Sequence, residues 1–291
     1  MKRALLLLLV AVLVLTPGAS AKPGPFPVVA VENFWGSIAA QLAGSRATVQ
    51  SVISNPGTDP HGYEPTPSDA RTLALSKVAI LNGLGYDNWA SQLLDANPYD
   101  GRVVVDAGDV LGLKQGDNPH QWYSPTSVRK VVDAIVAAFD QADPAGRSYF
   151  AARKRAFEHT ALARYDALRA QIRRRFAGVP VGYSESIFAP LGASLRVKLA
   201  TPAGFAKAVA EGNEVSPSDM QTVEQQLRRN EVRIWIYNSQ NVTPDVEQLT
   251  SLARAAHIPV VAITETLSPE KATFQQWQSN QLAALLRALR R

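Results

Sequence analysis

The sequence predicts an α/β protein built from two doubly wound α/β lobes with central parallel sheets, joined by one long rigid helix. Three observations predict this fold. Short apolar runs rich in β-branched residues alternate with amphipathic stretches over residues 22–142, as expected for parallel strands that are buried on both faces. The same alternation starts again after residue 178, and the segment between, 143–177, carries one helical stripe of apolar side chains.

Residues 1–21 form a predicted signal peptide. Lys2 and Arg3 precede an apolar run over 4–15, and residues 19–21 read ASA, a small-x-small cleavage pattern. The apolar run is too short to cross a bilayer, and no later stretch is long and apolar enough to do so. We therefore expect an exported protein, periplasmic or, as the alternative, secreted. Because the sequence has no cysteine, we expect no lipid anchor.

The first lobe is predicted over residues 22–142. Its expected strands are the apolar runs at 28–31, 49–54, 78–83 and 103–108. Amphipathic stretches such as SDARTLALSK separate these runs and are predicted to be helices. Apolar strands that alternate with helices in this way indicate a parallel sheet covered on both faces.

The connecting helix is predicted over residues 143–177. Asp143 and Pro144 form an N-cap and first-turn pair, and Gly178 and Pro180 end the helix. Apolar side chains recur at helical spacing within it: Phe150, Phe157, Ala161, Tyr165, Leu168, Ile172 and Phe176. A helix of about thirty residues is roughly 45 Å long at 1.5 Å per residue, which is enough to run along both lobes.

The second lobe is predicted over residues 178–291. Its expected strands are VPVGYS, LRVKLA, RIWIYN and IPVVAIT, and its expected helices include SPSDMQTVEQQLRRN and TPDVEQLTSLARAAH. A last helical stripe is expected to pack against a lobe and consists of Phe274, Trp277, Leu282, Leu285, Leu286 and Leu289.

Composition excludes several kinds of function. The absence of cysteine rules out disulfides, thiolate metal ligands and cysteine nucleophiles. Without residues 1–21 the chain has 28 Lys and Arg against 25 Asp and Glu, a net charge of +3. This excess is small and mostly interspersed, so we expect no nucleic acid partner. His, Asp, Glu, Ser and Lys remain as candidates for chemistry.

Two histidines lie in proline-flanked loops: His61 in TDPHGYEP and His120 in DNPHQWYSP. Each follows a predicted strand by several residues, so each is expected outside the carboxyl end of a strand, where open α/β sheets bind ligands. Proline restricts the backbone and holds the imidazole partly in place before binding. One loop histidine alone is weak evidence for a ligand, but the repeated setting strengthens the pair. His159 and His257 fall on or at the end of predicted helices and carry no such signal.

Two glutamates directly follow predicted strands of the second lobe. Glu185 comes after VPVGYS and Glu265 after IPVVAIT. Taken alone, each is more often an N-cap or a solvated loop acid. Together with His61 and His120, they would place two imidazoles on one lobe opposite two carboxylates on the other. This set of donors predicts a divalent-metal site across the space between the lobes.

Enzymatic interpretations are weaker. Ser184 in GYSES follows a strand as a hydrolase nucleophile would, but the glycine required two residues later is replaced by Ser186. A metal-dependent hydrolase that uses His61 and His120 is the stronger enzymatic alternative, although the sequence contains no HExxH pair. Four protein ligands would leave little room for the bound water of a catalytic metal. We therefore expect a binding protein and not an enzyme.

Five motifs occur in a fixed order along the chain: DPHGYEPTPSD, LNGLGYDNW, NPHQWYSP, then, after the long helix, YSESIF and ITETLSPE. In these motifs the chain resembles the zinc/manganese family of metal-binding proteins that feed ABC importers, the cluster A-I solute-binding proteins. The resemblance covers essentially the whole chain after residue 21. It implies the two-lobed fold and four metal ligands, His61, His120, Glu185 and Glu265. It also implies a membrane permease with its ATPase as partner, and we expect the protein itself to be a monomer.

The chain departs from the family pattern at positions that bear on the metal. Many zinc-binding members have a histidine where Glu185 stands, and the stretch GLKQGDNP lacks the histidines of their histidine-rich loop. The fourth ligand is often Asp, whereas here it is Glu265. The cargo is therefore expected to be Mn(II) or Zn(II), with Fe(II) as a third candidate. A bidentate carboxylate would permit the higher coordination number of Mn(II), which favours manganese slightly. The resemblance also allows a surface adhesin as an alternative function.

Overall fold

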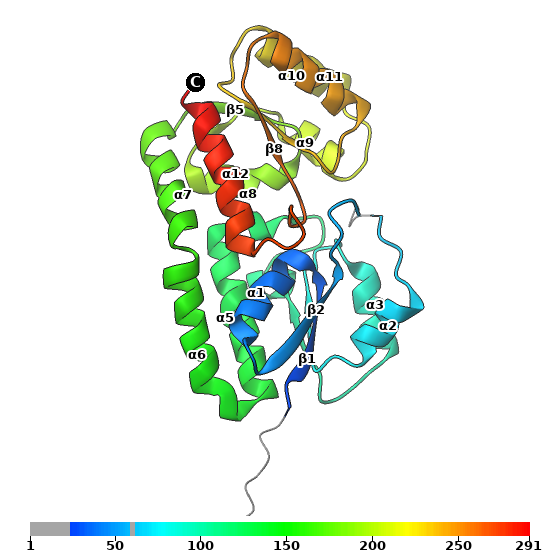
Figure 1. Cartoon of the computed structure of the whole chain (residues 1–291). Coiled ribbons are helices and arrows are strands. Elements are labelled where there is room, and N and C mark those ends of the chain that lie inside the picture. Colours follow the sequence, from blue (N-terminus) through cyan, green and yellow to red (C-terminus); the bar gives the residue numbers. More distant parts are fainter. Residues whose placement is uncertain (1–23, 59–61) are drawn as a thin grey trace, which may run out of the picture.

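The computed structural model describes residues 24–58 and 62–291. The predicted signal peptide, 1–21, and His61 lie outside these described residues. Two four-stranded sheets form the centres of two lobes, which are stacked one above the other in Figure 1. Every strand pair in both sheets is parallel. The predicted α/β class with two parallel-sheet lobes is confirmed.

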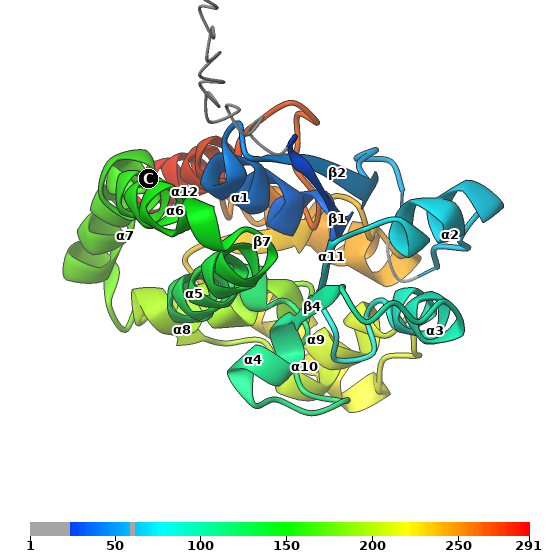
Figure 2. The ribbon, with the colours of Figure 1, turned by 90° about the horizontal axis from the view of Figure 1, so that it is seen from below.

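The first sheet has the strand order β2-β1-β3-β4. Its strands are β1 (Phe26–Glu32), β2 (Ala47–Ile53), β3 (Val78–Leu81) and β4 (Val103–Asp106). Its helices are α1 (Asn33–Ala43), α2 (Pro67–Ala74), α3 (Asn88–Ala96), α4 (Ala107–Leu111) and α5 (Pro125–Ala142). Helices α1 and α5 cover one face of the sheet, and α2 and α3 pack on the other. Seen from below in Figure 2, α2 and α3 lie on the side away from α5.

The residues of β1 explain why this strand needs helices on both faces. Val28 and Ala30 pack into the core shared with α1 and α5, whereas Val29 and Val31 pack toward α2 and α3. Successive side chains of a strand point to opposite faces, and all four are at most 3% exposed. The strand therefore has no polar face, which is why it is a continuous apolar run in the sequence.

The connection between the two sheets is helical but not one regular helix. Its parts are the 3-10 turn Pro144–Gly146, α6 (Arg147–Ala156), the π-helical turn Phe157–Ala161 and α7 (Ala163–Phe176). In the π-helical turn the N–H of Leu162 donates to the carbonyl of Phe157, five residues back. The wider turn buries Leu162, whereas Ala161, expected on the apolar stripe, is only partly buried. Figure 1 shows α6 beside the first lobe and α7 beside the second.

The second sheet repeats the arrangement of the first, with the order β6-β5-β7-β8. Its strands are β5 (Pro180–Tyr183), β6 (Lys198–Leu199), β7 (Trp235–Asn238) and β8 (Val260–Ile263). Its helices are α8 (Ala189–Leu195), α9 (Ala203–Ala210), α10 (Pro217–Arg228), α11 (Pro244–Ala255) and α12 (Phe274–Leu289). Helices α9, α10 and α11 pack on one face in a separate cluster, and the other face packs toward α7, α8 and α12.

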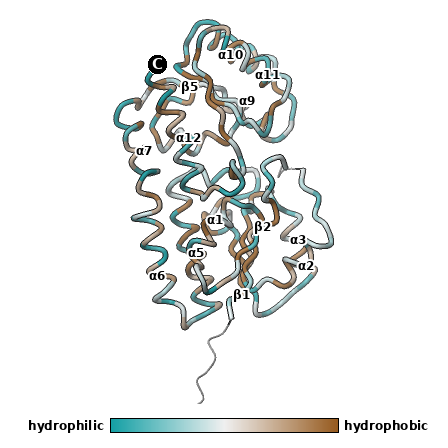
Figure 3. Tube along the Cα trace, viewed as in Figure 1, coloured by the Kyte–Doolittle hydropathy of each residue, from teal (hydrophilic) through white to brown (hydrophobic). Residues whose placement is uncertain are grey.

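The two lobes share one hydrophobic core. It contains buried residues of β1, α1 and α5 from the first lobe and of β8 and α12 from the second, and it includes α7. Figure 3 shows hydrophobic segments gathered in the strands of the first sheet, while hydrophilic segments lie on outer turns. Separating the lobes widely would expose this core to water, at a cost that rises with the apolar area exposed. We therefore expect only limited lobe movement.

Helix α1 also holds the end of the second lobe through polar contacts. Asn33 Oδ1 accepts a hydrogen bond from the N–H of Leu267 at 3.1 Å. One turn further along α1, Ser37 Oγ accepts from the N–H of Phe274 at 2.9 Å. The segment that carries Glu265 is thus attached to both lobes.

Candidate metal-binding site

Three of the four predicted ligands meet where the two lobes face each other. Glu185 follows β5, Glu265 follows β8, and His120 directly precedes the 3-10 turn Gln121–Tyr123. The fourth, His61, lies outside the described residues. Strand order reverses between β5 and β7, because β6 lies on one side of β5 and β7 on the other. Glu185 is therefore at a topological switch point, the usual position of ligand sites in open α/β sheets.

The three side chains are close together and buried. His120 Nε2 lies 3.5 Å from Glu185 Oε1 and 3.9 Å from Glu265 Oε1. One donor atom from each residue lies within 4.8 Å of the others, and none of the three residues is more than 2% exposed. One nitrogen and two carboxylate groups at these separations could converge on a single divalent cation.

The ring of His120 is oriented by the asparagine of its own motif. Asn118 Oδ1 lies 2.9 Å from both the backbone N and the ring Nδ1 of His120. An amide oxygen only accepts, so Nδ1 carries the proton and Nε2 is left free of a proton, as a nitrogen that ligates a metal must be. The other end of Asn118 donates from Nδ2 to the carbonyl of Ser186 in the second lobe at 2.7 Å. One side chain thus fixes the imidazole tautomer and connects the lobes.

Both carboxylates are fixed by hydrogen bonds. Glu185 Oε2 accepts from Asn238 Nδ2 at 2.8 Å and from Asn241 Nδ2 at 3.3 Å. Glu265 accepts from Asn238 Nδ2 on Oε1 at 2.9 Å and from the Tyr86 hydroxyl on Oε2 at 2.7 Å. Tyr86 belongs to the first lobe, so Glu265 is held from both sides.

The electrostatics of the pair favour a cation. Burial, followed by the charge of Glu265, raises the pKa of Glu185 well above its ordinary value. Burial and the nearby carboxylates, with Glu265 first, likewise raise the pKa of Tyr86, so its hydroxyl stays a donor. Two buried carboxylates repel each other, and a divalent cation between them would relieve this repulsion.

An aromatic cluster supports His120 from the first lobe. Trp122 is fully buried, and its ring stacks on that of Phe34, with centroids 3.9 Å apart. The same ring lies 5.2 Å from the His120 ring and 5.3 Å from the Tyr86 ring. Packing of this kind limits the movement of a ligand before binding.

Known proteins identify the family. Over residues 28–288 the chain matches the family described as zinc-uptake complex component A, periplasmic (ZnuA). The chain belongs to this family. The predicted resemblance to metal-binding solute-binding proteins of ABC importers is thereby confirmed.

Two relatives share less than a third of their aligned residues with this chain. The manganese-binding lipoprotein MntA of Halalkalibacterium halodurans is 29% identical over 143 residues, covering 48% of this chain and 47% of that protein. The chain thus matches less than half of that relative. The iron-binding protein YfeA of Yersinia pestis is 26% identical over 264 residues, covering 88% of this chain and 74% of YfeA.

Solved structures of similar fold include two manganese-bound proteins. A periplasmic metal binding protein of Candidatus Liberibacter asiaticus with bound Mn has a TM-score of 0.75 at 19% identity, covering 91% of this chain and 99% of that one. FpvC of Pseudomonas aeruginosa in complex with Mn2+ has a TM-score of 0.73 at 21% identity, covering 91% and 98%. At these identities the similarity supports the fold and does not assign a metal to this family member.

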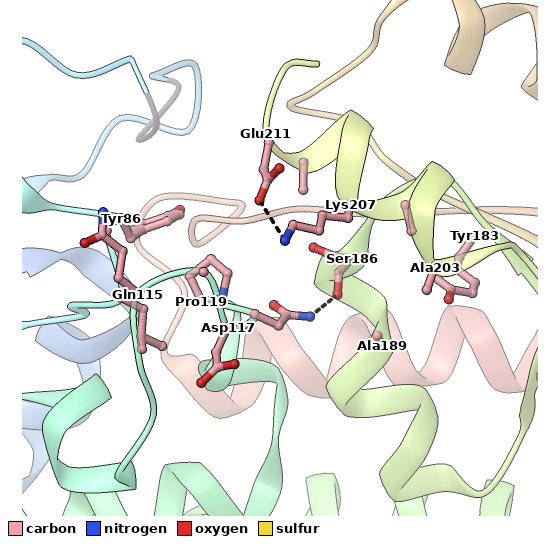
Figure 4. Close-up of a pocket in the computed structure, with 16 residues that line it drawn as sticks. Tyr86, Gln115, Asp117, Pro119, Tyr183, Ser186, Ala189, Ala203, Lys207 and Glu211 are labelled. Carbon is pink, nitrogen blue, oxygen red and sulfur yellow. Dashed lines mark hydrogen bonds and ion pairs between the residues drawn. The ribbon is translucent and has the colours of Figure 1, made fainter. Parts of the chain in front are cut away.

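A cavity of about 460 Å³ is lined by residues of both lobes, among them Tyr86 and Ser186 (Figure 4). The cavity lining also includes Asn118 of the first lobe. Tyr86 and Asn118 contact the candidate ligands Glu265 and His120, and Ser186 follows Glu185 directly in the second lobe. Lys207 and Glu211 pair across one side of the cavity at 3.6 Å. Asn118 and Ser186, which are joined by a hydrogen bond, both line this cavity, and Asn118 also contacts the His120 ring.

The sequence patterns did not predict a role for four residues that contact the candidate ligands, Tyr86, Asn118, Asn238 and Asn241. Asn118 lies inside the NPH motif, and Tyr86 inside LNGLGYDNW, so a signal was present for both. Asn238 ends the apolar run RIWIYN, and a polar residue at the end of a buried strand was the available indication. Nothing in the sequence places Asn241 near a ligand.

Replacing Asn118 with alanine is expected to weaken metal binding by about 10- to 100-fold, the usual cost of losing the group that orients a ligating histidine. The imidazole would lose the acceptor that fixes its tautomer. Competition titration against a chelator of known affinity measures the change. Asn118→Asp keeps the acceptor and loses the bond to Ser186, so it should bind more tightly than the alanine variant. Equal affinity of Asn118→Ala and the wild type would contradict this role.

A second pair of buried acids lies in the first lobe, apart from the three candidate ligands. Glu32 ends β1 and is fully buried. Burial, then the charge of Asp87, raises the pKa of Glu32 well above its ordinary value. Burial also raises the pKa of Asp87 to about 6, although its carboxylate accepts from the N–H groups of Asn82 and Gly83. Among the described residues, no other side chain donates to Glu32 while both acids are ionised, but a proton on Glu32 allows it to donate to Asp87.

This pair predicts that the stability of the metal-free protein falls as pH rises. Both acids have higher pKa values folded than unfolded, so the folded chain binds more protons from about pH 4 upward. Their contribution to the free energy of unfolding is complete at low pH. It is lost as pH rises through the pKa values of the folded state, which are about 6 for Asp87 and well above the ordinary value for Glu32. Urea unfolding across pH 5 to 8 measures the slope. As pH rises from 5 to 8, the free energy of unfolding of Glu32→Gln should increase relative to that of wild type by on the order of 1 to 2 kcal/mol.

The exposed Glu270 offers a matched control for this measurement. Glu270→Gln should change the free energy of unfolding by less than about 0.5 kcal/mol at every pH. If Glu32→Gln and wild type have parallel profiles, Glu32 does not hold a proton in the folded protein.

Proposed function

We propose that this protein captures a divalent transition metal between its lobes and delivers it to the membrane permease of an ABC importer, which works with its ATPase. The ligands are His120, Glu185 and Glu265, with His61 as the fourth. The supporting observation is the meeting of one imidazole and two carboxylates, buried and within 4.8 Å of one another, from segments far apart in the chain.

The donor set limits the metal. Imidazole and carboxylate groups suit Zn(II), Mn(II) and Fe(II), and the chain has no cysteine to favour a thiophilic ion. A cation enclosed by four protein side chains is held for transport, since catalysis needs an open position for water or substrate. We therefore propose a carrier and not an enzyme, and family membership favours neither the hydrolase nor the adhesin alternative.

Elemental analysis tests this function directly. Protein purified without chelator should contain close to one equivalent of manganese, zinc or iron, and the metal-free form should bind Mn(II) and Zn(II) in competition titrations. His61→Ala should lower the affinity. No metal on purification and no binding on titration would refute the proposal.

We propose that the protein is exported to the periplasm through its signal peptide, with no lipid anchor. The second point differs from relatives named as lipoproteins, such as MntA. Across residues 24–58 and 62–291, no helix is both long and apolar enough to cross a membrane. Mass spectrometry of the mature protein, together with detergent partitioning, tests the proposal. A start at Lys22 with no added lipid is expected, and a lipid-modified mass would contradict it.

A further inference from the structure

Asn238 connects the two candidate carboxylate ligands directly. It ends β7, the strand between β5 and β8, and it is fully buried. Its single side-chain nitrogen donates to Glu185 Oε2 at 2.8 Å and to Glu265 Oε1 at 2.9 Å. Because an amide nitrogen carries two hydrogens, one side chain can serve both acceptors at once.

The orientation of the Asn238 amide is fixed by its other contacts. Its Oδ1 accepts from the N–H of Gln240 at 3.0 Å, and its backbone N–H donates to Ser184 Oγ at 3.2 Å. Turning the amide over would place its oxygen against two carboxylates and its NH2 against an N–H donor. The NH2 group therefore faces Glu185 and Glu265.

The bridge leaves the two oxygens of Glu185 in different situations. Oε2 is held by Asn238 and, more weakly, by Asn241. Oε1 faces His120 Nε2 at 3.5 Å. Glu185 thus presents one oxygen toward the imidazole and is restrained from turning the second toward the same point.

From this arrangement we infer that Asn238 is a positioning residue that restrains Glu185 to one metal-facing oxygen and so favours Zn(II) over Mn(II). The inference rests on the proposed metal-capture function. Zinc is satisfied by four ligands in a tetrahedron, whereas Mn(II) suits octahedral oxygen-rich sites. Restraining Glu185 to one oxygen keeps the ligand number low. This preference is the reverse of the slight one for manganese that the sequence suggested.

The test compares Asn238→Ala with Asn241→Ala, which removes the longer of the two hydrogen bonds to Glu185 Oε2 and leaves the bridge. The measured quantity is the ratio of the Mn(II) to the Zn(II) dissociation constant, from competition titrations of metal-free protein. Wild type should prefer zinc. The ratio should fall about tenfold in Asn238→Ala, within the range known for groups that orient ligands, and less than threefold in Asn241→Ala.

The ratio of dissociation constants separates positioning from a merely structural effect, since a general loss of packing weakens the binding of both metals alike. An unchanged ratio in Asn238→Ala, or equal shifts in both variants, would overturn the inference. Asn238→Thr serves if the alanine variant does not fold, because one hydroxyl hydrogen cannot bridge two carboxylates; it should shift the ratio in the same direction.

Manganese K-edge absorption provides a second readout. The oxygen ligand count around Mn(II) should be higher in Asn238→Ala than in wild type, and an equal count would contradict the inference. If wild type itself binds no metal, the proposed function fails and the inference with it. If wild type binds metal normally but the ratio does not respond to Asn238, only the inference fails.

Discussion

Replacing His120 with alanine is expected to lower the affinity for Mn(II) and Zn(II) by more than about 100-fold, beyond the cost of losing a group that only orients a ligand. His120 supplies the nitrogen of the three-residue cluster. Its removal would leave Glu185 and Glu265 facing each other without the imidazole that lies within 3.5 Å and 3.9 Å of them. The remaining carboxylates would form a weaker site of lower ligand number.

Titration of metal-free His120→Ala against a competing chelator measures this loss. His159→Ala is the matched control, because His159 is exposed in the π-helical turn, whereas the three candidate ligands are buried. It should bind metal as wild type does. Wild-type affinity in His120→Ala would mean that the cluster is not the metal site.

Replacing Trp122 with alanine is expected to reduce the free energy of unfolding by about 3 to 5 kcal/mol, the usual range for deleting a buried aromatic ring. Trp122 has no exposed surface. Its ring stacks on Phe34 and contacts the rings of His120 and Tyr86. A cavity here would also loosen His120, so metal affinity should fall together with stability.

Urea unfolding of the metal-free variant measures the stability loss, and chelator competition measures the affinity. Trp122→Phe should recover most of the stability, since a smaller ring can still stack on Phe34. Trp89→Ala is a suitable comparison, because Trp89, in α3, is only partly buried and packs in a separate cluster. Wild-type affinity in a destabilised Trp122→Ala protein would show that the aromatic cluster supports the fold and not the site.

The sequence alone was sufficient for the architecture because the information was local. In β1, four consecutive residues from Val28 to Val31 are buried on alternating faces, and a strand without a polar face is visible as an apolar run. The same reasoning located the other strands, although LRVKLA contains only the two-residue β6. Strand ends were predictable too, which is why Glu185, Glu265 and His120 were placed near one another.

In the connecting helix, local periodicity was not sufficient to predict which side chains are buried. A regular helical period predicted Ala161 on the buried stripe, but the π-helical turn buries Leu162 in its place. Whether a helix takes an extra residue into one turn depends on the surfaces it packs against. Here those surfaces are α12, which packs on α7, and α1 and α5, which pack on α6.

What the sequence determined by itself was the fold class, the strand ends and the types of candidate ligand that follow them, because each depends on neighbouring residues. What only the tertiary structure decided was how those candidate ligands are held. Asn238 meets Glu185 across 53 residues of chain and Glu265 across 27, and Tyr86 meets Glu265 across 179. Such contacts arise from the packing of two sheets and leave no periodic trace in the sequence. The same packing, by burying two carboxylates side by side, raises the pKa of Glu185 and favours a cation there.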